Sequence, residues 1–273
     1  MINIFYCTDD KFFKQQLVSL ISLKNTTKEE LNVINLNVEC KKLNKHSKKM
    51  TDEQTAFLDG LLKTVNKNSS FRSIDVSNLF EEVMVKGPNL NWKFYSYFVT
   101  IRLIADLVKE IPDKVLYVDA DVIFNKDVKE LFDIDIEKVE IAGRRDKGRI
   151  FNYMQSGVML MNMALIRKTG LLERARKLVT TKKYLYIDMT PMNIACKKRL
   201  ILPKKYNNYK YNENNIIHHV CDTRVGKIPL TKKWWRRVKT DEEELMISFH
   251  PEYKNIYDEL EVYKNSHPEL FRK

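Results

Sequence analysis

Residues 114–121, with the sequence Lys-Val-Leu-Tyr-Val-Asp-Ala-Asp, constrain the fold more than any other stretch of the chain. Residues 115–118 are apolar throughout and show no polar alternation, which predicts a strand buried on both faces. Asp119 and Asp121 follow, and residues two apart in an extended chain point to the same side. In an open α/β sheet, ligands bind at the carboxyl ends of the strands. The segment therefore predicts a central strand with two carboxylates converging at its end.

Two carboxylates that converge in this way suit a divalent cation. Carboxylate oxygens are preferred ligands of Mg²⁺ and Mn²⁺, and a cation held by one or two carboxylates commonly completes its shell with substrate phosphates. In the alternative interpretation, Asp119 and Asp121 only cap the turn that follows the strand. The neighbouring motifs are needed to distinguish metal binding from turn capping.

The composition is that of a folded globular chain. It has 273 residues with 44% hydrophobic content, and only 7 Gly and 7 Pro, which argues against long linkers. No apolar run approaches the roughly 18 residues of a membrane span, and Asp9 and Asp10 make the N-terminus unlike a signal peptide. The cysteines lack metal-ligand spacing, which favours reduced thiols in a cytosol-like compartment (Cys7, Cys40, Cys196 and Cys221). We therefore expect a cytoplasmic protein.

Strand-like and helix-like segments alternate along the chain. Predicted strands lie at residues 2–7, 31–38, 71–76, 140–143 and 215–221. Predicted helices lie at residues 51–63, 96–109, 127–132, 165–179 and 188–195. This alternation predicts an α/β fold with a mostly parallel central sheet flanked by helices. The chain lacks GxGxxG, which disfavours a dinucleotide-binding fold of the usual kind.

One large domain is expected to occupy residues 1–240. Residues 241–273 are predicted to form a C-terminal extension, a strand or loop followed by a terminal helix, packed on that domain. Between the central strand and this extension, Gln155-Ser156-Gly157 is interpreted as a turn that opens the apolar run at 158–163.

Nearly all of the net charge of +12 lies in residues 197–239, where thirteen Lys and Arg face only Glu213 and Asp222. This excess favours a polyanionic partner, which can be a phosphorylated substrate, an anionic lipid surface or a nucleic acid. Trp234 and Trp235, flanked by cations, add the aromatic anchors typical of a membrane surface. The alternative is a solvated basic face with both tryptophans packed in the core. The segment has no RNP, zinc-finger or helix-turn-helix signature, so no nucleic acid is expected.

Five motifs in one order resemble those of the family 8 glycosyltransferases, typified by glycogenin and bacterial lipopolysaccharide galactosyltransferases. They are Asp9-Asp10-Lys11-Phe12, Ser73-Ile74-Asp75-Val76, Arg102-Leu103, the segment ending in Asp119-Ala120-Asp121, and the run from Met154 to Asn162. The resemblance implies a GT-A-type domain that transfers a hexose, glucose or galactose, from a UDP-sugar with retention of configuration. It also implies Mn²⁺ or Mg²⁺ as the cofactor and a glycan, lipid-linked or protein acceptor.

The resemblance also assigns roles at the donor's nucleotide. Asp119 and Asp121 would hold the metal, and Asp119 would also reach the ribose. Asp9 would hydrogen-bond the uracil, and Phe12 would stack on it unless it is an ordinary core residue. The remaining donor contacts would come from Thr8, Ala120 and Lys227, the last neutralising the leaving diphosphate.

Near the reacting sugar, the resemblance places Arg102, Gln155 and Asp188. Arg102 would face the diphosphate and sugar, or else form a salt bridge on a helix surface. Gln155 stands where the family has Asn, and Asp188 is either a site residue or a helix N-cap. Met189 and Thr190 replace the Gln and Asp that normally follow Asp188. These departures leave open a sugar-nucleotide-binding protein without transferase activity.

A third metal ligand is expected from a late strand. The resemblance implies a histidine there, and the chain offers His218 and His219, which face opposite sides of the strand, so that at most one should ligate. His250 is a further candidate. The resulting hypothesis is a metal-dependent hexosyltransferase in the cytoplasm, able to contact an anionic membrane surface peripherally.

Overall fold

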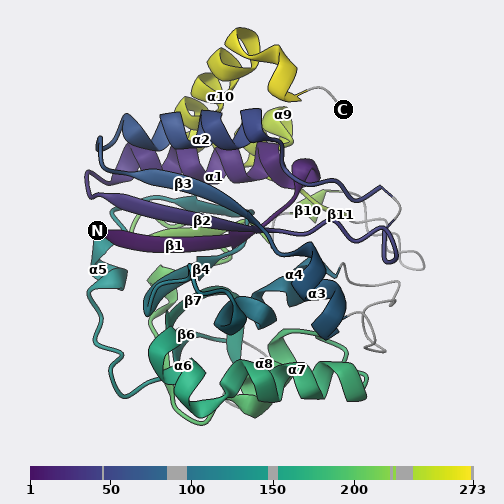
Figure 1. The fold of residues 1–273 in the computed structure, drawn as a ribbon. Coiled ribbons are helices and arrows are strands. Elements are labelled where there is room, and N and C mark those ends of the chain that lie inside the picture. Colours follow the sequence, from purple (N-terminus) through teal and green to yellow (C-terminus); the bar gives the residue numbers. More distant parts are fainter. Residues whose placement is uncertain (45, 85–96, 147–152, 222–223, 226–235, 272–273) are drawn as a thin grey trace, which may run out of the picture.

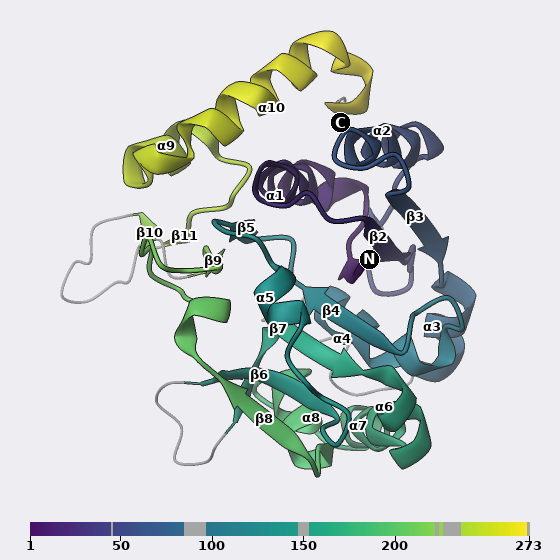
Figure 2. The same cartoon turned by 90° about the vertical axis from the view of Figure 1, so that its left-hand side faces the viewer.

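The structure is a computed structural model, and it describes residues 1–44, 46–84, 97–146, 153–221, 224–225 and 236–271. Its centre is a seven-stranded sheet with the order β3-β2-β1-β4-β7-β6-β8 (Figures 1 and 2). The strands are β1 (Ile2–Cys7), β2 (Leu31–Asn37), β3 (Ser70–Asp75), β4 (Lys114–Val118), β6 (Ile141–Arg145), β7 (Met154–Asn162) and β8 (Arg199–Leu202). The segment that the sequence placed at the centre, β4, is the middle strand.

Six of these strands run in one direction. The pairs β1–β2, β2–β3, β1–β4 and β6–β8 are parallel, whereas β7 pairs antiparallel with both β4 and β6. The expectation of a mostly parallel sheet in an α/β fold is confirmed. The reversed strand β7 brings its first residues beside the end of β4, and this position matters for the site.

The central strands are buried on both faces because helices cover both faces of the sheet (Figure 2). In β4, Leu116 and Val118 enter one core cluster, and Val115 and Tyr117 enter the other. This division follows from the side-chain alternation of a strand. It explains why residues 115–118 are all apolar.

One face of the sheet is covered by α1 (Phe13–Thr26), α2 (Asp52–Lys63), α5 (Lys129–Phe132), α9 (Glu243–Phe249) and α10 (Lys254–Ser266). The other face is covered by α3 (Ser77–Met84), α4 (Phe98–Ile101), α6 (Met163–Thr169), α7 (Leu171–Thr181) and α8 (Met189–Ala195). Thr51 begins α2 with the expected capping box. The C-terminal α10 lies against α1. Within the described residues, no helix combines the length and apolar character needed to cross a membrane.

Two small sheets and several short 3₁₀ segments lie outside the main sheet. The pair β5 (Val122–Phe124) and β9 (Ile217–His219) is antiparallel, as is the pair β10 (Arg224–Val225) and β11 (Arg236–Arg237). The 3₁₀ segments are η1 (Asp10–Phe12), η2 (Arg102–Leu107), η3 (Lys204–Tyr206), η4 (Pro251–Tyr253) and η5 (Pro268–Phe271).

Four sequence-based expectations were wrong in detail. The helix expected at 96–109 is only α4 followed by η2. The helix expected at 165–179 breaks into α6 and α7 at Gly170, whose φ of 67° ends the first helix in a left-handed cap. Gln155-Ser156-Gly157 is not a turn, because all three residues lie in β7. The start of the C-terminal extension is α9 instead of a strand or loop.

Candidate functional site

The two carboxylates lie where β4 ends beside β7. The pairing of Val118 with Val158 continues one residue further, since the Asp119 amide donates to the Gly157 carbonyl at 2.8 Å. Tyr117 donates from its hydroxyl to Asp119 Oδ1 at 2.5 Å. Asp119 is therefore held by its own strand and by the neighbouring one.

The strand β9 brings His219 to the same point. In the register with β5, His219 pairs with Val122, the residue directly after Asp121, and the Val220 amide donates to the Asp121 carbonyl. His219 Nε2 lies 3.2 Å from Asp121 Oδ1 and 3.9 Å from Asp119 Oδ2. Ligand atoms of these three residues all lie within 4.8 Å of one another, the one such group of three among the described residues.

Gly157 makes the close approach of these side chains possible. A Cβ at this position would lie 2.2 Å from His219 Cε1 and 2.9 Å from Asp119 Oδ2, well inside van der Waals contact. Any side chain would displace a candidate metal ligand. The Gly of the Gln-Ser-Gly motif is therefore required by space, since its backbone has an ordinary negative φ.

The charges in this cluster depend on one another. Burial raises the pKa of Asp119, and the negative charge of Asp121 raises it further, although Arg102 opposes the shift. Burial opposes protonation of His219, but Cys221 and Asp121 raise the pKa of the imidazole well above its usual value. Because a metal ligand must be deprotonated, a cation bound here would displace a proton from this cluster.

Arg102 connects the carboxylate cluster with Asp188. Its buried guanidinium donates from Nη2 to Asp119 Oδ1 at 2.8 Å and from Nη1 to the Ser156 carbonyl at 2.5 Å, and Nη1 lies 3.5 Å from Asp188 Oδ2. Asp188 precedes α8, but its side chain makes no capping hydrogen bond. The helix-cap and surface-salt-bridge interpretations of Asp188 and Arg102 therefore do not fit.

The structure separates the paired histidines. His218 is fully buried on the other side of β9, where its Nδ1 lies 2.8 Å from the Tyr253 hydroxyl and its ring lies 4.9 Å from that of His250. Neither His218 nor His250 belongs to the cluster with the two aspartates. Of the three histidines, only His219 lies where it could bind a metal together with the two aspartates among the described residues.

Comparison with known proteins places these observations in a family. The model of glycosyl transferase family 8 matches residues 3–225. The chain belongs to this family. Glycosyltransferase GlyA of Streptococcus pneumoniae is 30% identical over 132 residues, which are 45% of this chain and 18% of that protein. The lipopolysaccharide 1,3-galactosyltransferase of Salmonella typhimurium is 26% identical over 171 residues, 53% of this chain and 50% of that protein. The chain thus spans half or less of these two relatives.

Solved structures agree on the fold. The bifunctional glycosyltransferase WbbM superposes with a TM-score of 0.66 at 17% identity, over 94% of this chain and 51% of that one. The galactosyltransferase LgtC, solved with donor and acceptor sugar analogues, superposes with a TM-score of 0.59 at 18% identity, over 93% of this chain and 100% of that one. The family 8 domain here therefore has the GT-A fold.

The first family 8 motif lies at the end of β1, next to the cluster's central strand. Asp9 is buried and caps the start of η1, where its side chain accepts a hydrogen bond from the Phe12 amide. Burial raises the pKa of Asp9 to about 6. The Thr8 hydroxyl instead points into the core, bonded to Gln16 and Asn35. The structure thus gives the Thr8 side chain an internal role.

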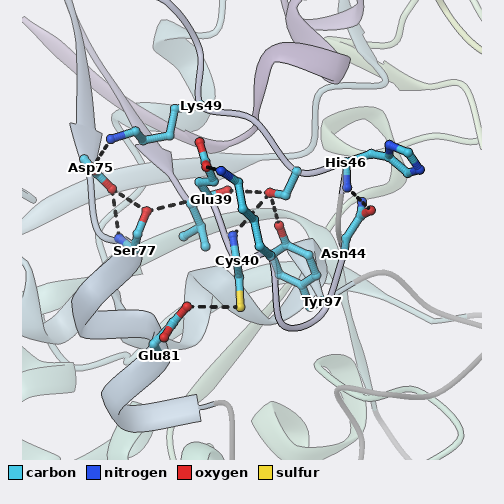
Figure 3. A network of polar contacts seen from close by, with 12 residues as sticks. Glu39, Cys40, Asn44, His46, Lys49, Asp75, Ser77, Glu81 and Tyr97 are labelled. Carbon is cyan, nitrogen blue, oxygen red and sulfur yellow. Dashed lines mark hydrogen bonds and ion pairs between the residues drawn. The ribbon is translucent and has the colours of Figure 1, made fainter.

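Phe12 is half-buried and belongs to a row of aromatic rings. It packs edge-to-face on Phe98 at 5.5 Å, and Phe98 stacks on Tyr97 at 4.4 Å. The Tyr97 hydroxyl lies 2.6 Å from Ser47 Oγ, and Ser47 Oγ accepts from the Cys40 amide (Figure 3). Through this contact, the loop after β2 holds the Tyr97 end of the row of aromatic rings in place.

Gln155 lies in β7, two residues before Gly157. Its Nε2 donates to Asp146 Oδ1 at 3.0 Å, while its buried Oε1 has no hydrogen-bond partner. Ala120 lies between the two carboxylates. Lys227, Trp234 and Trp235 lie outside the described residues.

Sequence reasoning missed Tyr117 and Asn207. Tyr117 was interpreted only as a core residue, although its hydroxyl reaches Asp119. Asn207 Oδ1 lies 3.1 Å from His219 Nδ1 and so fixes the ring that faces the carboxylates. The role of Tyr117 could have been predicted from its position two residues before Asp119, because residues i and i+2 lie on the same side of a strand. Asn207 carried no such signal.

Proposed function

We propose that this protein is a retaining, metal-dependent hexosyltransferase that moves glucose or galactose from a UDP-sugar to a glycan, lipid-linked or protein acceptor. The observation that carries the proposal is the cluster of Asp119, Asp121 and His219 at the carboxyl end of β4, in a chain that belongs to family 8. The donor and the metal are expected to meet there.

The donor set fits Mn²⁺. Two carboxylates and one imidazole combine the oxygen ligands preferred by Mg²⁺ and Mn²⁺ with a nitrogen ligand that Mg²⁺ rarely takes. Gly157 leaves space for the three side chains to approach one point. A bound divalent cation would supply a positive charge that stabilises the departing diphosphate.

The protein's own residues would bind and orient the donor around this point. Asp9 would accept the N3–H of uracil, and Phe12 would stack on the base. Arg102 fixes the orientation of Asp119 and holds Asp188 beside the site through its second amino group. The unsatisfied Oε1 of Gln155 would accept a hydrogen bond from a sugar hydroxyl, since a buried polar atom normally has a partner.

A panel of UDP- and GDP-sugars tests the proposal. Each is incubated with the protein and Mn²⁺, and slow donor hydrolysis is followed by mass spectrometry. Release of UDP from UDP-glucose or UDP-galactose, abolished by chelation of the metal, is expected. UDP binding without any turnover on the panel or on acceptor mixtures would instead favour a sugar-nucleotide-binding protein, which the replacements at Met189 and Thr190 keep open.

Peripheral attachment to an anionic membrane from the cytoplasmic side is a further part of the proposal. It rests on the charge of residues 197–239 and on the paired tryptophans. Sedimentation with anionic and neutral vesicles at low and high salt tests it. Binding that depends on both lipid charge and salt supports attachment, whereas equal sedimentation in all conditions contradicts it.

A further inference from the structure

A basic pocket of about 340 Å³ lies next to the candidate metal site. It is lined by Arg144 of β6 and by residues 204 and 208–212, which precede β9 and include Lys204 and Lys210. The Tyr209 ring in its wall contacts the His219 ring edge-on, at a centroid distance of 5.3 Å. None of the described residues that line it is acidic.

Arg144 is a buried cation that forms no ion pair with a carboxylate of the described residues. Only 4% of the residue is exposed, its Nη1 donates to the Asn207 carbonyl at 2.6 Å, and its Cζ lies 4.8 Å from the centre of the Tyr209 ring. Its buried Nε has no hydrogen-bond partner. Across the described ranges, no carboxylate forms an ion pair with Arg144.

The other two buried arginines of the described chain differ from Arg144 in having carboxylate partners. Arg102 pairs with Asp119 and Asp188, and Arg176 pairs with Asp106 through both of its amino groups. Buried charges are normally paired in this way, because an unpaired charge away from water is expensive. A buried guanidinium that lines a pocket and lacks a carboxylate therefore points to an anion supplied by a ligand.

The position of the pocket connects such an anion with the reaction. Asn207 accepts from Arg144 through its carbonyl and contacts His219 Nδ1 through its side chain. Asn207 would therefore link a group bound at Arg144 to the candidate metal ligand His219. Tyr209 and Tyr211 add aromatic faces, and Asn208 and Asn212 add amide groups suited to hydroxyls.

We propose that the basic pocket binds an anionic group, a phosphate or a carboxylate, carried by the acceptor. Arg144 forms the fixed contact, and the exposed Lys204 and Lys210 add charge at the opening. This inference rests on the proposed transferase function, because it assigns the pocket to the acceptor side of the same site. A carboxylate on the donor sugar itself is the other source of the same chemistry.

Binding of glucose 6-phosphate and of glucose to the full chain tests the pocket. Both are titrated by calorimetry into protein saturated with UDP and Mn²⁺, so that the donor's phosphate positions are filled. We expect glucose 6-phosphate to bind at least about tenfold more tightly than glucose, the difference expected for one charge-assisted contact. Equal affinities would overturn the inference. Failure of UDP and Mn²⁺ to bind would instead contradict the proposed function.

Two lysines of one segment provide matched variants. Lys210→Gln removes a cation from the pocket, whereas Lys205→Gln removes one that points to Glu130. We expect Lys210→Gln to weaken glucose 6-phosphate binding about tenfold, with UDP affinity unchanged, and Lys205→Gln to leave both unchanged. Arg144→Met, checked by circular dichroism, should abolish the preference for the phosphate. Equal effects of the two lysine variants would overturn the assignment.

A further titration uses UDP-glucuronate in place of UDP and tests whether the pocket binds a carboxylate of the donor sugar. If the pocket takes a donor carboxylate, UDP-glucuronate will block glucose 6-phosphate, and Lys210→Gln will weaken UDP-glucuronate but not UDP-glucose. That result would overturn the acceptor assignment. Simultaneous binding of UDP-glucuronate and glucose 6-phosphate supports it.

Discussion

Gly157 determines how closely His219 and the carboxylates can approach. Only a hydrogen atom fits in place of a side chain at Gly157, because a Cβ there would overlap the His219 ring. The residue lies on β7, whereas the ligands follow β4 and end β9. Three elements must therefore be in register before the cluster forms.

Gly157→Ala is expected to lower Mn²⁺ affinity by about tenfold or more, because the new methyl group displaces a ligand. The fold should remain, since the backbone at Gly157 is ordinary. Calorimetric titration with Mn²⁺ measures the effect. Gly60→Ala is the control: no atom lies within 4 Å of its added Cβ, and alanine favours the α2 helix. Equal Mn²⁺ affinity of wild type and Gly157→Ala would contradict the geometry.

The paired histidines should respond differently to alanine substitution. His219→Ala removes the imidazole that faces the carboxylates, so Mn²⁺ affinity should fall by more than about tenfold. His218→Ala removes one of the two hydrogen-bond partners of the Tyr253 hydroxyl from the interior, so thermal stability should fall while Mn²⁺ affinity stays nearly constant. Mn²⁺ titrations and thermal melts separate the effects. Loss of Mn²⁺ affinity only in His218→Ala would reverse the assignment.

Asp9 gives the site a pH dependence that does not involve the metal. Burial raises its pKa to about 6, so the carboxylate that would accept the uracil N3–H becomes protonated below that pH. Uridine, which needs no cation, should bind about tenfold more weakly at pH 5 than at pH 7, as expected one unit below such a pKa. Asp9→Asn should bind weakly at both values. Uridine affinity that is constant from pH 5 to 7 in the wild type would exclude this role.

At the scale of elements, the sequence predicted the strands and the carboxylates well because each signal is local. The apolar run before Asp119 and the capping box at Thr51 depend only on neighbouring residues. The reversed direction of β7 does not, since it is set by how the chain returns to the sheet. For this reason Gln155-Ser156-Gly157 was misassigned as a turn.

Selection of His219 over His218 also required the tertiary structure. Both residues lie on a strand at opposite faces, and the sequence leaves both as candidates. The pairing of β9 with β5 decides which face meets the carboxylates. The lack of a carboxylate partner for Arg144 among the described residues is likewise not visible in the sequence, because it depends on which acids lie near it in space.

The C-terminal extension supplies a prediction for α10. Leu260 is fully buried in the core cluster that contains α1, whereas Val262 on the same helix is 63% exposed. Leu260→Ala should lower the free energy of unfolding by about 2–5 kcal/mol, and Val262→Ala should change it by less than about 0.5 kcal/mol. Chemical denaturation measures both. If residues 241–273 pack on the main domain as we propose, Leu260→Ala will shift one cooperative transition. A separate transition for the extension would contradict that.

At the scale of the whole molecule, the fold brings together residues distant in sequence at one edge of the sheet. Asp9 follows β1, the two carboxylates of the candidate metal site follow β4, and His219 lies in the small sheet beside them. This agrees with the rule that ligands bind outside the carboxyl ends of the strands in α/β sheets. The basic pocket adjoins the same edge through Tyr209, so the proposed donor and acceptor contacts share one region.

The central claim is that Asp119, Asp121 and His219 hold a divalent cation that binds the donor's diphosphate. Calorimetric titration of UDP, with Mn²⁺ and with chelator, into wild type and Asp121→Asn tests it most directly. We predict that UDP binds the wild type at least about tenfold more tightly with Mn²⁺, and that Asp121→Asn, still folded, loses this enhancement because a neutral amide attracts the cation less. Equal UDP affinity with Mn²⁺ and with chelator, or an undiminished Mn²⁺ effect in Asp121→Asn, would contradict the account.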